Sequence, residues 1–128
     1  MRKNKVVFTL LLLGIFLVGM LLSATAQGVN MPKNIIHHVT LKWKEGTTDA
    51  DKQKVIDGLK AILAEVKGVK GLWVKSTKVQ PGDFSQTFVV EFENQAALDA
   101  YAKHPKKKAW NDLYYSVREV SYNSVTTN

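Results

Sequence analysis

The stretch VQPGDFSQTFVVEFEN, residues 79–94, decides the fold because a turn, a strand and a helix start follow one another within it. In QPGD, residues 80–83, proline presets one turn dihedral angle and glycine accepts the other, which predicts a tight connection. Residues 84–93 alternate with the period of two of a strand that buries one face. The apolar face carries Phe88, Val90 and Phe92. Asn94 then suits the N-cap of a helix, so the stretch predicts a hairpin that leads into a helix.

Two strands and a long helix are predicted before this turn. Residues 35–44 alternate with period two, and one face of this first strand is clearly apolar. That face carries Ile35, His37, Val39, Leu41 and Trp43. Thr48 or Asp49 can cap the helix that follows, and Gly68 is placed to end it. The helix has an apolar stripe of Val55, Leu59, Ile62, Leu63 and Val66. Leu72–Gln80 is the predicted second strand, which pairs with the third across QPGD.

Two short helices and a last strand are predicted after the third strand. The first helix is Gln95–Lys103, and it ends at His104 because the residue before a proline disfavours helical geometry. Pro105 suits the first position of a second helix, and Val117–Ser124 is the last strand. The order of elements predicts an α+β, ferredoxin-like βαββαβ fold, in which an antiparallel sheet has its helices on one face.

The other face of the predicted sheet is left uncovered. It carries Ile36, His38, Thr40, Lys42, Trp73, Val79 and Val89. This face is too apolar to sit comfortably in water and too polar for an isolated core. A second copy of the chain would cover it, and a twofold homodimer is the commonest arrangement that does so.

The N-terminus has the layout of a secretory signal peptide. A basic start precedes an apolar run, and Ala24-Thr25-Ala26 supplies an A-x-A cleavage site. We therefore divide the chain into a signal peptide (1–26), a linker (27–34), one domain (35–124) and a C-terminal tail (125–128). The expected location is exported, either periplasmic or secreted. The alternative is a membrane anchor through an uncleaved leader, because the length of the apolar run is near the lower limit of length for a membrane-spanning helix.

Composition excludes several classes of function. The chain has no cysteine, so it has no disulfide, no thiol nucleophile and no zinc site of the cysteine type. Removal of the leader leaves fifteen basic and eleven acidic residues, a net charge of +4. Without a long basic stripe, such a charge does not indicate nucleic-acid binding. The histidines do not form an obvious ligand set and no phosphate-cradling glycine motif is present, so no metal or cofactor is expected.

Three segments together resemble a known family. They are HHVTLKWKEG (37–46), VVEFEN (89–94) and YAKHP (101–105), and their order resembles that of the stress-responsive α/β-barrel domain, or Dabb, over Ile35 to Tyr122. The resemblance implies a homodimer whose two sheets close into a barrel. The functions of the family include a plant polyketide cyclase that closes an aromatic ring by aldol chemistry and highly stable plant stress proteins. Related dimeric barrels include cofactor-free monooxygenases, so the fold does not assign a function.

The resemblance to the cyclase also implies a pocket between the sheet and the helices. Tyr101 corresponds to its pocket tyrosine, His104 to the histidine of its YxxHP motif, and His37 to a first-strand pocket histidine. The catalytic histidine of the cyclase corresponds to Lys107 here. This departure argues against the specific activity of the cyclase, but a pocket of similar make-up is still expected.

Each candidate residue also has a structural interpretation. His37 is a polar ring on an apolar strand face, and it is either a hydrogen-bonded core histidine or a pocket group. Packing beside Leu98 would account for Tyr101, whose hydroxyl could instead polarise a substrate carbonyl. His104 is most simply a cap or a corner residue. Lys106 to Lys108 oppose the positive end of a helix dipole, and they form either an anion site or a solvated tip.

Two hypotheses about function stay open. The first is a dimeric barrel whose pocket binds or transforms a small, partly apolar and acidic molecule. Its catalytic candidates are Tyr101 and His37, and its binding candidates are Leu41, Phe88, His104, Lys107 and Trp110. If it is an enzyme, cofactor-free acid/base chemistry of a cyclase, lyase or monooxygenase type is expected. The second hypothesis is a structural or stress-associated dimer with a filled core, which would lack the roughly 300 Å³ that small-molecule sites usually enclose.

Overall fold

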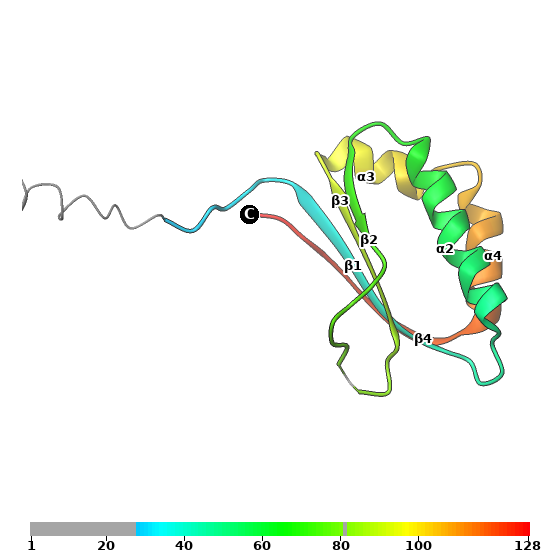
Figure 1. The fold of residues 1–128 in the computed structure, drawn as a ribbon. Helices are drawn as coiled ribbons and strands as arrows, with labels where there is room; N and C mark the ends of the chain where they lie inside the picture. Colours follow the sequence, from blue (N-terminus) through cyan, green and yellow to red (C-terminus); the bar gives the residue numbers. More distant parts are fainter. Residues whose placement is uncertain (1–27, 81) are drawn as a thin grey trace, which may run out of the picture. The chain divides into compact units, whose positions relative to one another are not determined.

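The computed structural model describes residues 28–80 and 82–128, and the domain runs from Met31 to Asn128 (Figure 1). The predicted signal peptide, residues 1–26, lies outside the described residues. None of the described helices combines the length and the apolar composition needed to cross a membrane.

The chain forms the predicted α+β, ferredoxin-like βαββαβ fold, with its second helical segment divided in two. Its elements are β1 (Ile35–Trp43), α2 (Asp49–Ala64), β2 (Val69–Trp73), β3 (Gln86–Phe92), α3 (Gln95–Ala102), α4 (Lys107–Val117) and β4 (Arg118–Thr126). The sheet has the order β2-β3-β1-β4, and all neighbouring strands are antiparallel. The helices lie on one side of the sheet, which confirms the predicted arrangement (Figure 1).

The core lies between the sheet and the helices, as the alternation predicts. In the register of β1 and β3, Val39 is opposite Phe88 and His37 is opposite Val90, so the apolar faces of the two strands coincide. The largest fully buried side chains are Phe88, Phe92, Leu41, Leu59, Ile62 and Val55. Burial of these faces is the main force that holds the helices on the sheet.

Side-chain caps set the starts of the first two helices. The backbone N–H of Asp51 donates to Thr48 Oγ1 at 3.1 Å, and that of Ala97 donates to Asn94 Oδ1 at 3.0 Å. The capping prediction for Asn94 is therefore confirmed, and of the two residues considered for α2 the cap is Thr48.

The second strand differs from its predicted bounds, Leu72–Gln80. Gly68 has a φ of +91°, which favours glycine, and it turns the chain directly into β2. The chain leaves the sheet after Trp73, where the side-chain amide of Gln86 donates to the carbonyl of Val74. The pairing of β2 with β3 is as predicted, and residues 82–83 form a turn, but this turn lies within a long loop and not directly between the two strand ends.

Other boundaries differ from the predictions by a few residues, and β3 begins at Gln86 instead of Phe84. Helix α2 ends at Ala64, before the predicted stop at Gly68, because the chain tightens into a turn in which Val66 N–H bonds to Leu63 O at 3.2 Å. Helix α4 begins at Lys107 rather than Pro105. Strand β4 continues to Thr126, beyond the predicted end at Ser124, because it pairs with β1 along that length.

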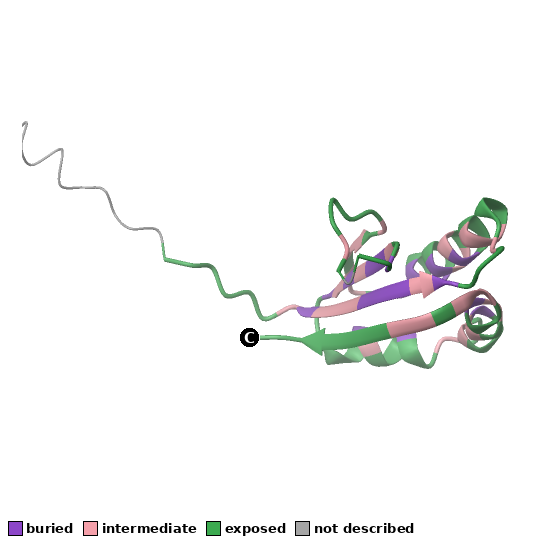
Figure 2. Cartoon of the chain, turned by 90° about the horizontal axis from the view of Figure 1, so that it is seen from below, coloured by how far each residue is buried: buried purple, intermediate pink, exposed green. Residues whose placement is uncertain are grey.

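The outer face of the sheet is largely open. Trp73 and Tyr122 are 51% and 62% exposed, and the second half of β4 is exposed along its length (Figure 2). Val79 was predicted to lie on this face within a strand. It belongs instead to the β2–β3 loop, which borders a shallow hollow beside Thr40 and Thr87. Both threonines are buried, so the loop covers part of the outer face and leaves the rest of that face uncovered.

A close contact between helices α2 and α4 yields a stability prediction. A Cβ atom added at Gly58 would lie 2.7 Å from Trp110 Cδ1, and the ring cannot move freely because its Nε1 donates to Val55 O at 2.8 Å. We expect Gly58→Ala to lower the free energy of unfolding by about 1–2 kcal/mol, although alanine is the better helix former, because overpacking costs about 1–3 kcal/mol. Urea denaturation would measure this loss.

Ala61→Gly on the exposed side of the same helix is the matched control. It isolates helix propensity, and we expect it to lower the stability by about 1 kcal/mol. Helix propensity alone would make Gly58→Ala more stable by about 1 kcal/mol, the reverse of the loss expected for Ala61→Gly. Such a gain would contradict the tight packing of α2 against α4.

Candidate functional site

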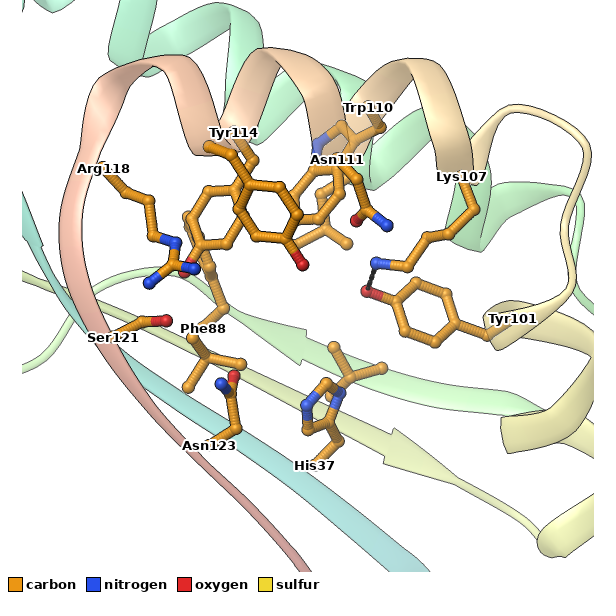
Figure 3. A pocket seen from close by; sticks show the side chains of 14 residues that line it. His37, Phe88, Tyr101, Lys107, Trp110, Asn111, Tyr114, Arg118, Ser121 and Asn123 are labelled. Atoms are coloured by element: carbon orange, nitrogen blue, oxygen red, sulfur yellow. Dashed lines mark hydrogen bonds between the residues drawn. The ribbon is translucent and has the colours of Figure 1, made fainter.

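A cavity of about 250 Å³ lies between the inner face of the sheet and helix α4 (Figure 3). Strand β1 supplies His37 to its wall, β3 supplies Phe88, and the end of α3 supplies Tyr101. At about 30 Å³ per water molecule, the space is equivalent to roughly eight waters. The interior is therefore hollow, and its size suits a molecule smaller than most drug-like ligands.

The fold brings together five of the seven residues that the sequence singles out. His37, Phe88, Tyr101, Lys107 and Trp110 all line the cavity.

Two predicted site residues lie elsewhere. Leu41 is completely buried in the hydrophobic core and does not reach the cavity. His104 occupies the corner between α3 and α4, where its Nδ1 accepts from the backbone N–H of Lys106 at 3.2 Å and its Nε2 lies 3.2 Å from a carboxylate oxygen of Glu65. Its position is that of a corner residue, which is the simpler of its predicted interpretations.

The three consecutive lysines point to three different places. Lys106 pairs with Glu65 of helix α2. Lys108 pairs with Asp112 at 2.9 Å, one turn further along α4. Lys107 turns into the cavity, where its Nζ donates to the Tyr101 hydroxyl at 2.7 Å (Figure 3). The lysines therefore act neither as one anion site nor as one solvated tip.

Aromatic rings enclose the Lys107 ammonium group. Its Nζ lies 4.3 Å from the ring centroid of Tyr101 and 4.1 Å from that of Trp110, within the range of cation–π attraction. The cavity wall contains no aspartate or glutamate among the described residues. Burial therefore acts without a compensating carboxylate and lowers the pKa of Lys107 to about 8.

The same burial changes the two groups that face this lysine. It raises the pKa of the Tyr101 hydroxyl well above its usual value, so this phenol keeps its proton. It also lowers the pKa of His37, and the nearby charges of Lys107 and His38 lower it further. At neutral pH the site therefore holds an unprotonated imidazole, a protonated phenol and an amine that titrates near pH 8.

Three buried polar atoms of the cavity wall lack a hydrogen-bond partner. They are His37 Nδ1, the Tyr114 hydroxyl and Arg118 Nε, and residues 28–80 and 82–128 contain no other such buried side-chain atom. An unsatisfied buried polar group costs about 1–3 kcal/mol. The three residues all line one cavity, while the unpartnered atoms themselves are buried in its wall.

The wall carries positive charge at two ends. Arg118 lies on the opposite side of the cavity from Lys107 (Figure 3), and its guanidinium is 4.7 Å from the ring centroid of Tyr115. No carboxylate in the described part of the chain forms an ion pair with it. The electrostatics of the cavity therefore favour an anionic group.

Sequence reasoning missed most of the wall that α4 and the first residue of β4 supply. Asn111, Tyr114, Tyr115 and Arg118 line the cavity beside Lys107. Their spacing from Lys107 is i+4, i+7, i+8 and i+11, which is the repeat of one helical face. Once Lys107 is assigned to the pocket, this repeat is the signal that could have found the others.

Alternation alone would also misplace Arg118. Its alternation with Val120 and Tyr122 places the three residues on one side of the last strand, but the register of β1 and β4 shifts between Lys42 and Trp43. The resulting irregularity pairs Arg118 with Trp43, whose side chain belongs to the inner face. A register shift of this kind redirects a side chain, and local alternation does not reveal it. The polar inner residues of β4, Ser121 and Asn123, also line the cavity.

Comparison with known proteins agrees with this architecture. A scan against protein families matches residues 35–123 to the stress responsive A/B barrel domain, Dabb. A comparison with curated protein sequences found no match.

Similar solved structures share the fold at low sequence identity. A Dabb family protein with a ferredoxin-like fold from Mesorhizobium loti is 23% identical with a TM-score of 0.63, and the similarity covers 74% of this chain and 96% of that one. A dimeric ferredoxin-like protein of unknown function from Bacteroides fragilis is 16% identical with a TM-score of 0.59, and the similarity covers 77% of this chain and 100% of that one. A cofactor-independent oxygenase from Streptomyces nogalater is 11% identical with a TM-score of 0.62, and the similarity covers 75% of this chain and 93% of that one.

Proposed function

The chain belongs to the stress-responsive α/β-barrel (Dabb) family, and on this premise we propose that it is an exported homodimer that binds a small, partly apolar molecule with an acidic group. The cavity beneath α4 is the binding site. The observation that carries the proposal is the wall itself, in which Lys107 and Arg118 face a hollow whose described lining contains no carboxylate.

The wall can recognise both parts of such a molecule. Phe88, Trp110 and Tyr114 offer aromatic surface to an apolar body. Arg118 presents a planar guanidinium that can bind a carboxylate through two parallel hydrogen bonds. Binding of an anion here would offset the cost of keeping Arg118 and Lys107 partly out of water.

The cavity could also support acid/base chemistry. The unprotonated His37 could accept a proton, and Tyr101 could donate one to a substrate oxygen. Both roles stay predictions. The hollow interior favours a binding function over the alternative of a structural dimer with a filled core.

The open sheet face supports the homodimer. Its helices cover one side only, and solved structures of the same fold include proteins described as dimeric. A twofold contact between outer faces would cover exposed groups such as Trp73 and Tyr122. Export rests on residues 1–26 alone.

Binding of benzoate tests the proposal for the cavity. We expect benzoate to raise the melting temperature, and Arg118→Gln to weaken its binding about tenfold or more, because a hydrogen bond to a charged group contributes about 1.5–3 kcal/mol. Calorimetric titration would measure the affinity. Lys75→Gln, which removes an exposed cation elsewhere, is the matched control and should leave binding unchanged.

Benzyl alcohol provides the corresponding control for the ligand, because it keeps the ring and lacks the negative charge. Equal binding of benzoate and benzyl alcohol, or an unchanged affinity for benzoate in Arg118→Gln, would contradict the recognition of an acid.

A further inference from the structure

The amine of Lys107 has an environment unlike that of its two neighbours. Lys106 and Lys108 are exposed and paired with carboxylates. Lys107 lies within the cavity between two aromatic rings, and its one hydrogen-bond partner is the phenol of Tyr101. A lysine that is desolvated among apolar groups is the usual form of an amine nucleophile.

The protonation state at neutral pH supports this chemistry. A group with a pKa of about 8 is roughly one quarter unprotonated at pH 7.5, whereas an exposed lysine with a pKa of about 10.4 is unprotonated to only about 0.1%. The fraction of reactive amine is therefore roughly 200-fold larger at Lys107. The phenol beside it keeps its proton and is within hydrogen-bond distance.

We propose that Lys107 forms a reversible imine with the carbonyl carbon of a small aldehyde or ketone that enters the cavity. The inference rests on the proposed function, because it uses the same cavity, and it narrows the ligand class to carbonyl compounds. Since Arg118 lies on the opposite side of the space, the best substrate carries a carboxylate at the end remote from the carbonyl (Figure 3). The structure thus assigns Lys107 as the nucleophile and Tyr101 as the proton carrier.

The chemical step needs only groups that the cavity supplies. The lone pair of the neutral Lys107 amine attacks the carbonyl carbon, and the C–N bond forms as the carbonyl π bond opens. The Tyr101 hydroxyl donates a proton to the carbonyl oxygen and recovers one from the nitrogen, which gives a neutral carbinolamine. Loss of this oxygen as water, with the second amine proton, leaves the C=N bond. The balance is one amine and one carbonyl to one imine and one water, without an oxidant or a metal.

Reductive trapping of the wild-type protein tests the proposal. The probe is 4-carboxybenzaldehyde with sodium cyanoborohydride at pH 7.5, because hydride reduction converts an imine into a stable secondary amine. Peptide mass spectrometry then gives the rate of modification at each lysine. We expect Lys107 to be modified at least tenfold faster than Lys108, which is its internal control in the same helix. Modification of Lys107 no faster than of Lys108 would overturn the proposal.

The dependence of the modification rate on pH gives a second readout, which a difference in the accessibility of the lysines to the probe would not produce. The rate at Lys107 should rise with pH and level off above roughly pH 9, one pH unit past a pKa of about 8, where most of its amine is neutral. The rate at Lys108 should continue to rise, because pairing with Asp112 raises the pKa of that group. Parallel profiles for the two lysines would contradict the assigned role.

Two further measurements separate this inference from the proposed function. Tyr101→Phe should slow trapping at Lys107 tenfold or more, and an unchanged trapping rate would remove Tyr101 from the mechanism. Benzoate binding without selective trapping at Lys107 would refute imine formation and leave the binding site intact. Selective trapping by benzaldehyde without benzoate binding would support the imine and refute recognition of an acid.

Discussion

Replacement of Trp110 by alanine is expected to lower the free energy of unfolding by about 3–5 kcal/mol. Trp110 makes three contacts that hold α4 together and tie it to α2. Its indole N–H donates to Val55 O of helix α2 at 2.8 Å, and its ring stacks on Tyr114 with a centroid separation of 5.0 Å. It also forms the wall against which Lys107 lies. Since a domain has only about 5–15 kcal/mol of stability, the loss should remove a large part of it.

Urea denaturation followed by circular dichroism would measure this loss. Trp110→Phe keeps most of the apolar ring but lacks the indole N–H, so it should cost less than the alanine variant. Trp73→Ala is the matched control, because it removes a tryptophan from the half-exposed outer face. At protein concentrations below the dissociation constant of the proposed dimer, it should lower the free energy of unfolding by less than Trp110→Ala does. A loss of under 1 kcal/mol for Trp110→Ala would show that α4 is not anchored through this residue.

Substitution of Val89 by lysine is expected to weaken the proposed homodimer at least ~100-fold. Val89 lies in the central strand β3 of the outer face, opposite His38 of β1 and Trp73 of β2. In a twofold interface the new charge is introduced twice. Unpaired or like charges at an interface cost several kcal/mol, and each 1.4 kcal/mol is a tenfold change in affinity.

Light scattering over a range of concentrations would give the mass of each variant. Ala61→Lys adds the same charge on the exposed side of α2 and should remain dimeric. The folded monomer of Val89→Lys should keep its helical signal, because the substituted face does not contact the helices. A monomeric wild-type protein at micromolar concentration, or a Val89→Lys variant as dimeric as its control, would contradict an interface on this face.

Much of the fold follows from patterns that are local in the sequence. Period two in residues 35–44 and 84–93 assigns the inner faces of β1 and β3, because side chains of a strand alternate between its two sides. Thr48 and Asn94 mark helix starts, because their side chains satisfy backbone N–H groups at those ends. The predicted bounds of the second strand were wrong, because pairing partners, and not turn residues alone, set where β2 ends.

The candidate site was only partly predictable for the same reason. His37 and Tyr101 were found from the strand pattern and the family resemblance, and both line the cavity. The contribution of Arg118 depends on a register shift opposite Lys42 and Trp43, which involves two strands far apart in the chain. A pattern within one strand carries no information about such a shift.

By itself, the sequence determined the order of the elements, the buried faces of β1 and β3 and the presence of a basic cluster at 106–108. Only the tertiary structure decided what each lysine of that cluster does. Lys106 meets Glu65, Lys108 meets Asp112, and Lys107 enters a space without a carboxylate. Residue types and spacing are local properties, whereas burial and the pKa that it shifts depend on how α4 packs across the sheet. The chemistry proposed for Lys107 therefore arises from packing and not from a motif.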